Sequence, residues 1–303
     1  MSPITLPDRP PFVIRARVLS QLGAGGVRHE LDGRIEVNAA GRIAAVGPWA
    51  GEVAGTAPVI DLRPWAVLPG LVDLHAHLPQ LPNAGLGFGL PLLEWLGRYI
   101  FPLERAFDEG VAERVAPAAF RAFAAAGTTT AMLYGALWEP STDAAFRAAE
   151  THGIRAVIGK VMMDRLSYDP DAGERTAAEM LDLSLRQSAD LCSRWHMRDE
   201  GRLRYAFTPR FAVSCSADML RESARLAAQT GAYWQTHLSE DHGEIAEVGR
   251  LFPDALDYLD VYDRAGGLGP RAVLAHAIHL SNREVARLAE SGAHVAHCPE
   301  SNL

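Results

Sequence analysis

The chain has 303 residues, of which 48% are hydrophobic and 22% are charged, and its formal net charge is −8. This composition is typical of a soluble globular protein, and the acidic balance argues against a nucleic-acid backbone or an anionic membrane as its partner. No apolar run reaches the roughly 18 residues of a membrane-spanning helix, and residues 1–11 lack the basic start and apolar stretch of a signal peptide. Three widely spaced cysteines, Cys192, Cys215 and Cys298, favour a reducing cytoplasm.

Residues 12–62 contain four short runs of strand type, and helical periodicity is absent there. The predicted strands are Phe12–Leu19, Arg34–Val37, Arg42–Val46 and Val59–Leu62. Ala40-Gly41 lies between the second and third strands and indicates a hairpin. We therefore predict a small β-domain over residues 1–64.

From Trp65 onward, short apolar runs alternate with amphipathic stretches of helical period. The predicted strands are Ala66–Leu74, Thr128–Tyr134, Ala156–Met163, Leu203–Thr208, Ala232–Thr236, Ala272–Ala275 and Ala293–Ala296. The predicted helices are Glu113–Ala126, Ser141–Thr151, Ala172–Trp195, Ala217–Thr230 and Asn282–Ser291. Such alternation is typical of parallel strands with crossover helices, in a doubly wound sheet or in a (β/α)8 barrel. Polar residues follow the carboxyl ends of the strands, which favours a barrel over residues 65–303.

Histidines follow several of these strands at their carboxyl ends. His75 and His77 stand two residues apart, so both side chains point the same way from an extended strand. Two converging imidazoles suit a metal such as zinc, although this pair alone could be two surface histidines. His237, His276 and His297 end three later strands. Burying so many imidazoles together is costly unless a metal or hydrogen bonds hold them.

The stretch Pro69–His77 resembles the first barrel strand of the amidohydrolase superfamily, and the order of the histidines resembles its metal site. His297–Asn302 resembles the superfamily's purine and triazine aminohydrolase branch, although Glu300 stands at a position that varies there. Four more stretches resemble the guanine deaminases: Leu90–Leu96 with Phe101-Pro102, Gly159–Val161 with Asp164, Thr208–Phe211 with Ser214-Cys215, and His237–Glu240. The resemblance covers residues 65–303, and it implies an eight-stranded amidohydrolase barrel with residues 1–64 as part of a small β-sandwich.

The resemblance implies an enzyme with one zinc ion that hydrolyses guanine to xanthine and ammonia. The implied zinc ligands are His75, His77, His237 and His276, of which His237 would also contact the substrate and His276 would also serve catalysis. Zinc would make hydroxide available near neutral pH, and Glu240 would carry protons to the ring nitrogen and the leaving amine. From its position alone, Glu240 could instead belong to the first turn of the next helix, where acids are favoured.

The resemblance also implies that Gln80, Arg210 and Phe211 bind the purine. Arginine can donate to the carbonyl and ring nitrogen of guanine, and phenylalanine offers a face for stacking. From the residues alone, Gln80 could be a solvated loop residue, Arg210 could pair with a local acid, and Phe211 could belong to the core. Lys160 is the one candidate for a bridging ligand to a second metal, and its match to the mononuclear pattern argues against that role.

The chain stops at Leu303, soon after the seventh predicted strand of the barrel. The resemblance implies an eighth strand that ends in an aspartate, which would complete the zinc site. We therefore interpret the chain as a fragment and expect it to be inactive as a deaminase. The alternatives are a related hydrolase of another amino- or halo-heterocycle, and a non-catalytic pseudoenzyme or binding module. The implied partner is guanine, and the implied assembly of the complete protein is a homodimer.

Overall fold

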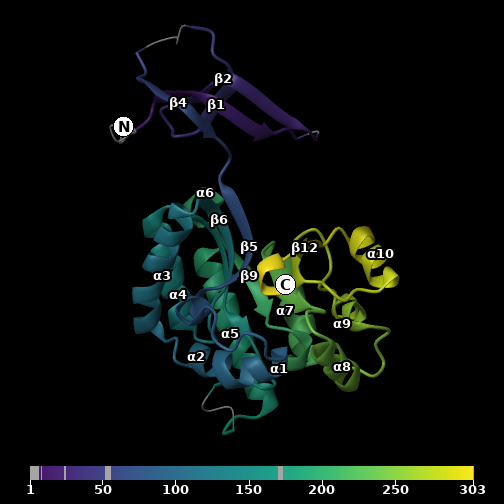
Figure 1. Ribbon diagram of the computed structural model, residues 1–303. Helices are drawn as coiled ribbons and strands as arrows, with labels where there is room; N and C mark the ends of the chain where they lie inside the picture. Colours follow the sequence, from purple (N-terminus) through teal and green to yellow (C-terminus); the bar gives the residue numbers. More distant parts are fainter. Residues whose placement is uncertain (1–6, 8, 24, 52–55, 170–172, 303) are drawn as a thin grey trace. The chain divides into compact units, whose positions relative to one another are not determined.

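The computed structural model of the chain describes residues 7, 9–23, 25–51, 56–169 and 173–302 (Figure 1). Residues 1–6 and 8, within the segment where we expect no signal peptide, lie outside the described residues. Contacts divide the chain into two compact units, residues 1–70 and 71–303. Within the described ranges, no helix is both long enough and apolar enough to cross a membrane.

The described residues of the first unit form a four-stranded sheet in the order β3-β2-β1-β4. These strands are β1 (Phe12–Gln21), β2 (Val27–Val37), β3 (Ile43–Pro48) and β4 (Val59–Val67). β1 pairs antiparallel with β2 and parallel with β4, while β2 pairs antiparallel with β3. The predicted hairpin is present between β2 and β3, where Asn38 Oδ1 accepts hydrogen bonds from the backbone N–H groups of Ala40 and Arg42.

The second unit is a nearly closed barrel of parallel strands with helices around it, as predicted (Figure 1). In the described part of this unit the strands follow the order β5-β6-β7-β9-β10-β11-β12, and the short β8 pairs with β9. The strands are β5 (Leu71–His77), β6 (Thr128–Tyr134), β7 (Arg155–Gly159), β8 (Val161–Met162), β9 (Leu203–Pro209), β10 (Tyr233–Leu238), β11 (Ala272–His276) and β12 (His294–Ala296).

Helices connect successive strands and cover the outside of the barrel (Figure 1). The longer helices are α3 (Glu109–Ala125), α4 (Glu139–His152), α5 (Ala177–Trp195), α7 (Ala217–Thr230), α8 (His242–Leu251), α9 (Tyr258–Arg264) and α10 (Asn282–Ser291). The short helical segments are η1 (Leu78–Asn83), α1 (Leu92–Trp95), η2 (Leu96–Ile100), α2 (Phe101–Arg105), α6 (Arg198–Gly201), η3 (Ala212–Ser214) and α11 (Pro299–Asn302).

Local sequence sets the ends of these helices. Thr176 and Ser281 cap α5 and α10 in capping boxes, because each hydroxyl accepts a hydrogen bond from the backbone three residues later. Gly153, Gly231 and Gly292 follow α4, α7 and α10 with left-handed φ angles near 70°, which glycine adopts without steric cost. Ser216 caps the start of α7 in the same way, by accepting a hydrogen bond from the backbone N–H of Met219. These signals explain why α7 and α10 begin and end at the predicted residues.

The structure differs from the predicted elements in several places. The predicted strand Ala66–Leu74 is divided, because β4 of the first unit ends at Val67 and β5 begins at Leu71. Pro69 between them has no N–H group for a strand ladder. The predicted strand Ala156–Met163 is interrupted at Lys160, and helices α8 and α9 were not predicted. One helix was predicted from Ala172, which lies outside the described residues. Residues 173–176 are not helical, and α5 begins only at Ala177, after its cap Thr176.

The apolar core fills the space between the strands and the surrounding helices. Phe146 of α4 and Trp195 of α5 are both buried, and their rings stack with centroids 5.1 Å apart. Leu203 of β9 and Leu220 of α7 are fully buried in the same cluster. Each large apolar side chain removed from water in this way contributes about 1.5–3 kcal/mol, so the core holds the strand ends in fixed positions.

Candidate active site

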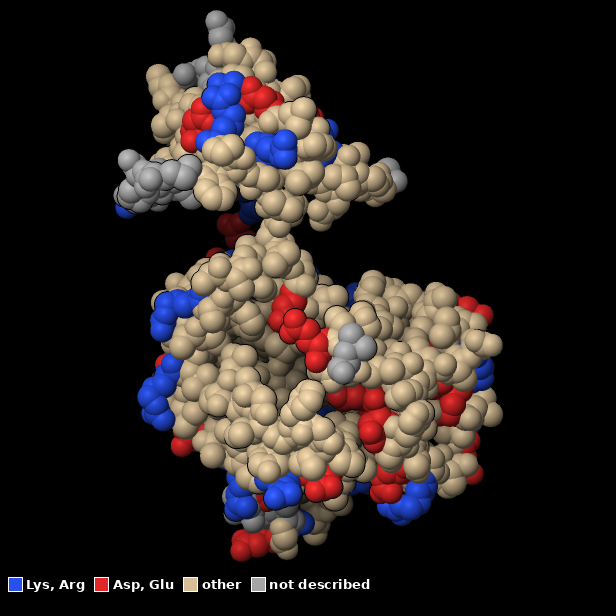
Figure 2. Space-filling view, viewed as in Figure 1, with Lys and Arg blue, Asp and Glu red and all other residues tan. Residues whose placement is uncertain are grey.

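A cavity of about 210 Å³ in the second unit collects residues from the ends of four strands and from the segments that follow them. Its lining includes the eight predicted site residues: His75, His77, Gln80, Arg210, Phe211, His237, Glu240 and His276. The same cavity is lined by Ala76, Leu92, Trp95, Leu96 and Ser301. Figure 2 shows a hollow on one face of this unit, with acidic side chains beside it. The structure therefore brings together residues that are up to 226 positions apart in the chain (75 to 301).

Four imidazole rings form the centre of this cavity. The ring centroid of His75 lies 5.1, 4.9 and 5.0 Å from those of His77, His237 and His276. Nε2 of His77 and Nε2 of His237 are 2.9 Å apart. Ligand atoms of His75, His77 and His237 all lie within 4.8 Å of one another, which is the separation expected for side chains that share one metal ion.

The protonation state of the histidines suits the binding of a cation. Burial, with the neighbouring histidines, lowers the pKa of His75 and His237 well below the ordinary value of 6.5, and burial lowers that of His276 to about 4. The rings are therefore neutral at pH 7 and keep lone pairs for a metal. Nδ1 of His75 is buried and has no hydrogen-bond partner among the described residues. A cluster of neutral nitrogen donors with such an unsatisfied atom fits a metal such as zinc.

The strands themselves position these rings. His75 and His77 alternate with Ala76 at the end of β5, and so they lie on the same side of the strand. The parallel register of β10 and β11 pairs Leu238 with His276, which places His237 and His276 on neighbouring strand ends. His276 has a left-handed φ of 70°, which is unusual for a residue with a side chain and frequent at functional sites.

The outer nitrogen of three rings faces a second group. Nδ1 of His237 is 2.6 Å from the backbone carbonyl oxygen of Arg210, and Nδ1 of His276 is 3.1 Å from the side-chain nitrogen of Asn302. Nδ1 of His77 lies 3.6 Å from a carboxylate oxygen of Glu104 and, like Nδ1 of His75, forms no hydrogen bond among the described residues. The hydrogen-bonded partners of His237 and His276 are of the kind that fix the orientation and tautomer of metal-binding histidines, which leaves Nε2 to point inward.

Glu240 lies beside the imidazole cluster, with Oε2 3.3 Å from Nε2 of His276. Helix α8 begins at His242 and is capped by Asp241, so Glu240 lies before the helix and not in its first turn. Burial, with the nearby Glu244, raises the pKa of Glu240 to about 8. This carboxyl therefore carries a proton at neutral pH and can donate it.

Gln80, Arg210 and Phe211 line the wall of the same cavity. Gln80 is half-buried, and its Nε2 donates to Oε1 of Glu104 at 2.9 Å. Arg210 is buried and forms an ion pair with the other oxygen of Glu104. Phe211 belongs to the apolar core and also presents its ring to His237, with centroids 6.5 Å apart. Arg210 thus has a local acid partner and Phe211 is core, while both still line the cavity.

Four residues of this region were not predicted as site residues: Glu104, Tyr134, Cys298, and Asn302 beside His276. Glu104 of α2 is fully buried and connects Arg210, Gln80 and His77. Tyr134 ends β6, and its ring lies 4.5 Å from that of His77. Its buried hydroxyl group has no hydrogen-bond partner in the described part of the chain. A polar side chain at a strand end is the signal by which Tyr134 could have been found, whereas Glu104 follows no strand.

Other sequence candidates lie elsewhere. His297 is exposed, and it is the neighbouring Cys298 whose thiol lies within 4.8 Å of ligand atoms of His75 and His276. Lys160 is buried in a separate cavity of about 140 Å³, where its amine donates to Ser184 Oγ at 3.3 Å. It faces helix α5 and not the histidines.

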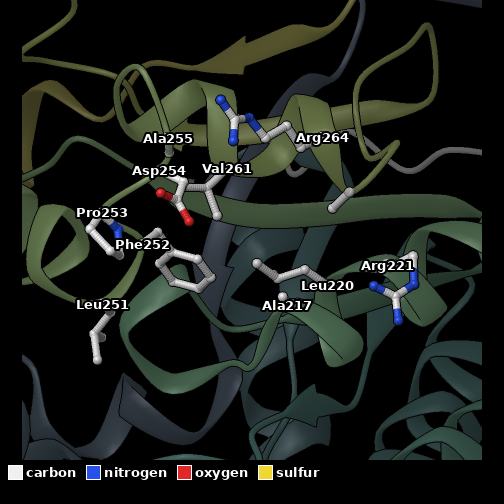
Figure 3. A pocket seen from close by; sticks show the side chains of 11 residues that line it. Ala217, Leu220, Arg221, Leu251, Phe252, Pro253, Asp254, Ala255, Val261 and Arg264 are labelled. Carbon is white, nitrogen blue, oxygen red and sulfur yellow. The ribbon is translucent and has the colours of Figure 1, made fainter.

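A further cavity of about 310 Å³ lies between α7, α9 and the segment after α8 (Figure 3). The ring of Phe252 points there toward the side chains of Leu220 and Val261 (Figure 3). None of the residues lining it is a histidine or a cysteine. Despite its size, this cavity lacks the convergent donor groups of the histidine site.

The family model described as the amidohydrolase family matches residues 66–303. Guanine deaminase of Escherichia coli (strain K12) is 40% identical over 268 residues, which are 87% of this chain and 59% of that protein. Guanine deaminase of Rattus norvegicus is 37% identical over 237 residues, which are 78% of this chain and 51% of that protein. The chain therefore spans between half and two thirds of the length of these two relatives.

Solved structures give the same comparison in three dimensions. The chain is similar to E. coli guanine deaminase with a TM-score of 0.85 and 34% identity, over 96% of this chain and 67% of that one. It is also similar to a guanine deaminase from C. acetobutylicum with guanine bound in the active site, with a TM-score of 0.88 and 29% identity. That likeness covers 96% of this chain and 68% of the other.

Proposed function

The chain belongs to the amidohydrolase family, and we propose that its histidine cavity serves the hydrolysis of guanine to xanthine and ammonia. One observation supports the proposal above the others. A cluster of neutral imidazoles, a protonated acid and a buried arginine line a single cavity in a chain that is 40% identical to a guanine deaminase. Hydrolysis of guanine by an enzyme needs these three kinds of group: a metal site, a proton donor and a hydrogen-bond donor to the carbonyl oxygen of guanine.

His75, His77, His237 and His276 would hold one zinc ion, consistent with the metal dependence that is general in this family. When bound, zinc supplies a hydroxide nucleophile near neutral pH and polarises the carbon that is attacked. The histidines need no proton change to bind it, because burial already keeps them neutral. Asn302 and the Arg210 carbonyl hold two of the rings in place.

Glu240 would move the protons of the reaction. Replacement of the exocyclic amine by oxygen needs one proton on the ring nitrogen during attack and another on the amine as it leaves. The raised pKa of Glu240, about 8, provides a protonated carboxyl at the start. After donating this proton to the ring nitrogen, the carboxylate can take one proton from the attacking water and pass it to the amine. It recovers its own proton from the newly added hydroxyl group as ammonia leaves, so that water and guanine yield xanthine and ammonia.

The wall of the cavity would recognise the base. Arg210 keeps N–H donors for a carbonyl oxygen, Gln80 contributes an amide, and Phe211 presents a ring face near His237. A cavity of about 210 Å³ suits a free base, and the net charge of −8 disfavours a nucleic acid. The thiols of Cys192, Cys215 and Cys298 are free, which fits our proposal of a cytoplasmic location.

The test is turnover by the full-length protein loaded with zinc, with guanine, adenine, cytosine and melamine as substrates and ammonia as the measured product. We expect release of ammonia from guanine alone, because a site built to bond a polar edge rejects analogues that lack it. The variant Glu240→Gln should lower kcat by about 100-fold or more, while Glu247→Gln on the surface of α8 serves as the control. Equal turnover of guanine and another substrate would contradict the proposal.

A further inference from the structure

Glu104 is the shared partner of the groups that line the substrate wall. It is fully buried on α2, and its two carboxylate oxygens are divided between two donors. Oε2 accepts from Nη1 of Arg210, and Oε1 accepts from Nε2 of Gln80 at 2.9 Å. Oε1 of Glu104 also lies 3.6 Å from Nδ1 of His77. One acid thus contacts both polar residues of the proposed base-binding wall and one imidazole of the metal site.

The charge of Glu104 decides how these donors are arranged. Its carboxyl forms an ion pair with the buried guanidinium of Arg210, and this neighbouring positive charge favours the ionised form of Glu104. An ionised carboxylate has no proton to donate and only accepts hydrogen bonds. The Gln80 amide must therefore turn its NH2 group toward Glu104.

The contacts of Gln80 and Arg210 with Glu104 determine which of their polar atoms remain available as donors or acceptors. With its nitrogen committed to Glu104, Gln80 leaves Oε1 without a hydrogen bond among the described residues, at the cavity that it lines. Arg210 commits Nη1 to Glu104, while Nε and Nη2 form no hydrogen bond in the described part of the chain. The wall therefore offers guanidinium donors together with one amide acceptor.

We infer that Glu104 is a positioning residue that sets the specificity of the site, by fixing the Gln80 amide so that the wall binds a ring edge with a carbonyl acceptor beside an N–H donor. This lactam edge is the one that guanine carries and that 2-aminopurine lacks, although both bases carry the same exocyclic amine. The inference rests on the proposed guanine activity and extends it, because it names the residue behind the choice of base.

The test compares binding of guanine and 2-aminopurine to the zinc-loaded full-length protein, with Glu240→Gln present in every form so that the bases are not consumed during the measurement. Guanine binding is measured by equilibrium dialysis with labelled guanine, and 2-aminopurine binding by its own fluorescence. The wild type should prefer guanine. In Glu104→Gln the residue at 104 has both a donor and an acceptor, so the Gln80 amide is free to rotate and to donate to the unprotonated ring nitrogen of 2-aminopurine. We expect the preference for guanine to fall at least about tenfold, with zinc content unchanged.

Two further variants separate this role from a structural one. Gln80→Met keeps the Glu104–Arg210 pair but removes the amide, so it should weaken guanine binding and leave 2-aminopurine binding nearly unchanged. Glu109→Gln, at an exposed acid paired with Arg147, should leave both affinities unchanged. An unaltered preference in Glu104→Gln, or equal losses for both bases in Gln80→Met, would overturn the inference. A wild-type chain that binds 2-aminopurine as tightly as guanine would instead overturn the guanine assignment, and the inference with it.

Discussion

The ion pair between Arg210 and Glu104 places two charges where water has almost no access. Side-chain exposure is 2% for Arg210 and 0% for Glu104. Removing such charges from water is costly, and replacement of a buried pair by apolar residues is often neutral or stabilising. The pair is therefore poorly explained by stability alone, and a role in arranging the donors of the cavity wall accounts for it.

Removing one member of this pair should damage the fold. In Arg210→Ala, Glu104 remains buried without its cation, and we expect the free energy of unfolding to fall by about 3–5 kcal/mol. Guanine binding should be lost, while zinc binding is weakened far less, because Arg210 contributes no metal ligand. Urea unfolding and zinc analysis measure the two effects. The control is Arg221→Ala, whose ion pair with Asp218 is exposed. A loss in Arg210→Ala no larger than in this control would contradict our account.

At the scale of elements, β7 and β9 approach each other so closely that only glycine fits at position 159. A Cβ atom added to Gly159 would lie 1.9 Å from Thr208 Oγ1 and 2.2 Å from the backbone oxygen of Ala206. We expect Gly159→Ala to destabilise the barrel by about 3 kcal/mol or more, since the backbone oxygen cannot move aside.

A second glycine provides a matched control for this prediction. Gly249 lies exposed in α8 with open space around it, so Gly249→Ala should leave stability unchanged or raise it by up to about 1 kcal/mol. Both variants are compared with the wild type by thermal or denaturant unfolding. Similar stabilities for the two variants would show that β7 and β9 are less tightly packed than the structure has them.

The start of helix α8 contains a buried acid whose protonation depends on folding. Glu244 accepts hydrogen bonds from the N–H groups of Glu240 and Asp241 and from the hydroxyl group of Tyr258. Burial nevertheless raises its pKa from 4.5 to about 7. Between these two pH values the folded chain binds a proton that the unfolded chain releases. The contribution of Glu244 to stability is therefore complete below about pH 4.5 and is lost as the pH rises through 7.

Glu244→Gln should remove this part of the pH dependence. The amide keeps an acceptor for the helix N-terminus but does not titrate, so the variant should lose less stability than the wild type between pH 4.5 and 7. Between pH 4.5 and 7 the free energy of unfolding of the wild type should fall by about 3 kcal/mol more than that of the variant, at 1.36 kcal/mol for each pKa unit. Urea unfolding at several pH values measures it, with Glu247→Gln on the same helix as the control. Parallel curves for Glu244→Gln and the wild type would refute the shifted pKa.

At the scale of the whole molecule, the proposed metal site links strands that are distant in sequence. His75 and His77 end β5, while His237 and His276 end β10 and β11. An ion bound by all four would stabilise the folded barrel relative to the unfolded chain. At zinc concentrations 100-fold above Kd this amounts to about 2.7 kcal/mol, which raises Tm by roughly 5–10 °C for a unit of this size.

Scanning calorimetry with zinc and with a chelator measures this stabilisation. His237→Ala should reduce the shift in Tm strongly, whereas His279→Ala should keep it, because His279 stacks on His242 outside the cluster. An equal zinc-induced shift in both variants would mean that the ion binds elsewhere.

The barrel could be predicted because its signals are local. The apolar run of β6 and the capped helices α7 and α10 are present at the predicted residues. Helix α8 was missed because two glycines, Gly243 and Gly249, weaken its helical pattern. Glu104 was missed for a different reason: its partner Arg210 is 106 residues away, and no local pattern marks an acid that becomes buried through such a contact.

The left-handed backbone at His276 limits which amino acids can replace this histidine, whether by design or in evolution. With φ at 70°, position 276 accepts asparagine, aspartate or glycine with little strain, and disfavours β-branched residues. His237 lies within the regular strand β10 and carries no such restriction. A library designed to exchange the metal should therefore vary position 237 broadly and position 276 narrowly. Aspartate at 276 is the single replacement that combines a tolerated backbone with a charged oxygen ligand.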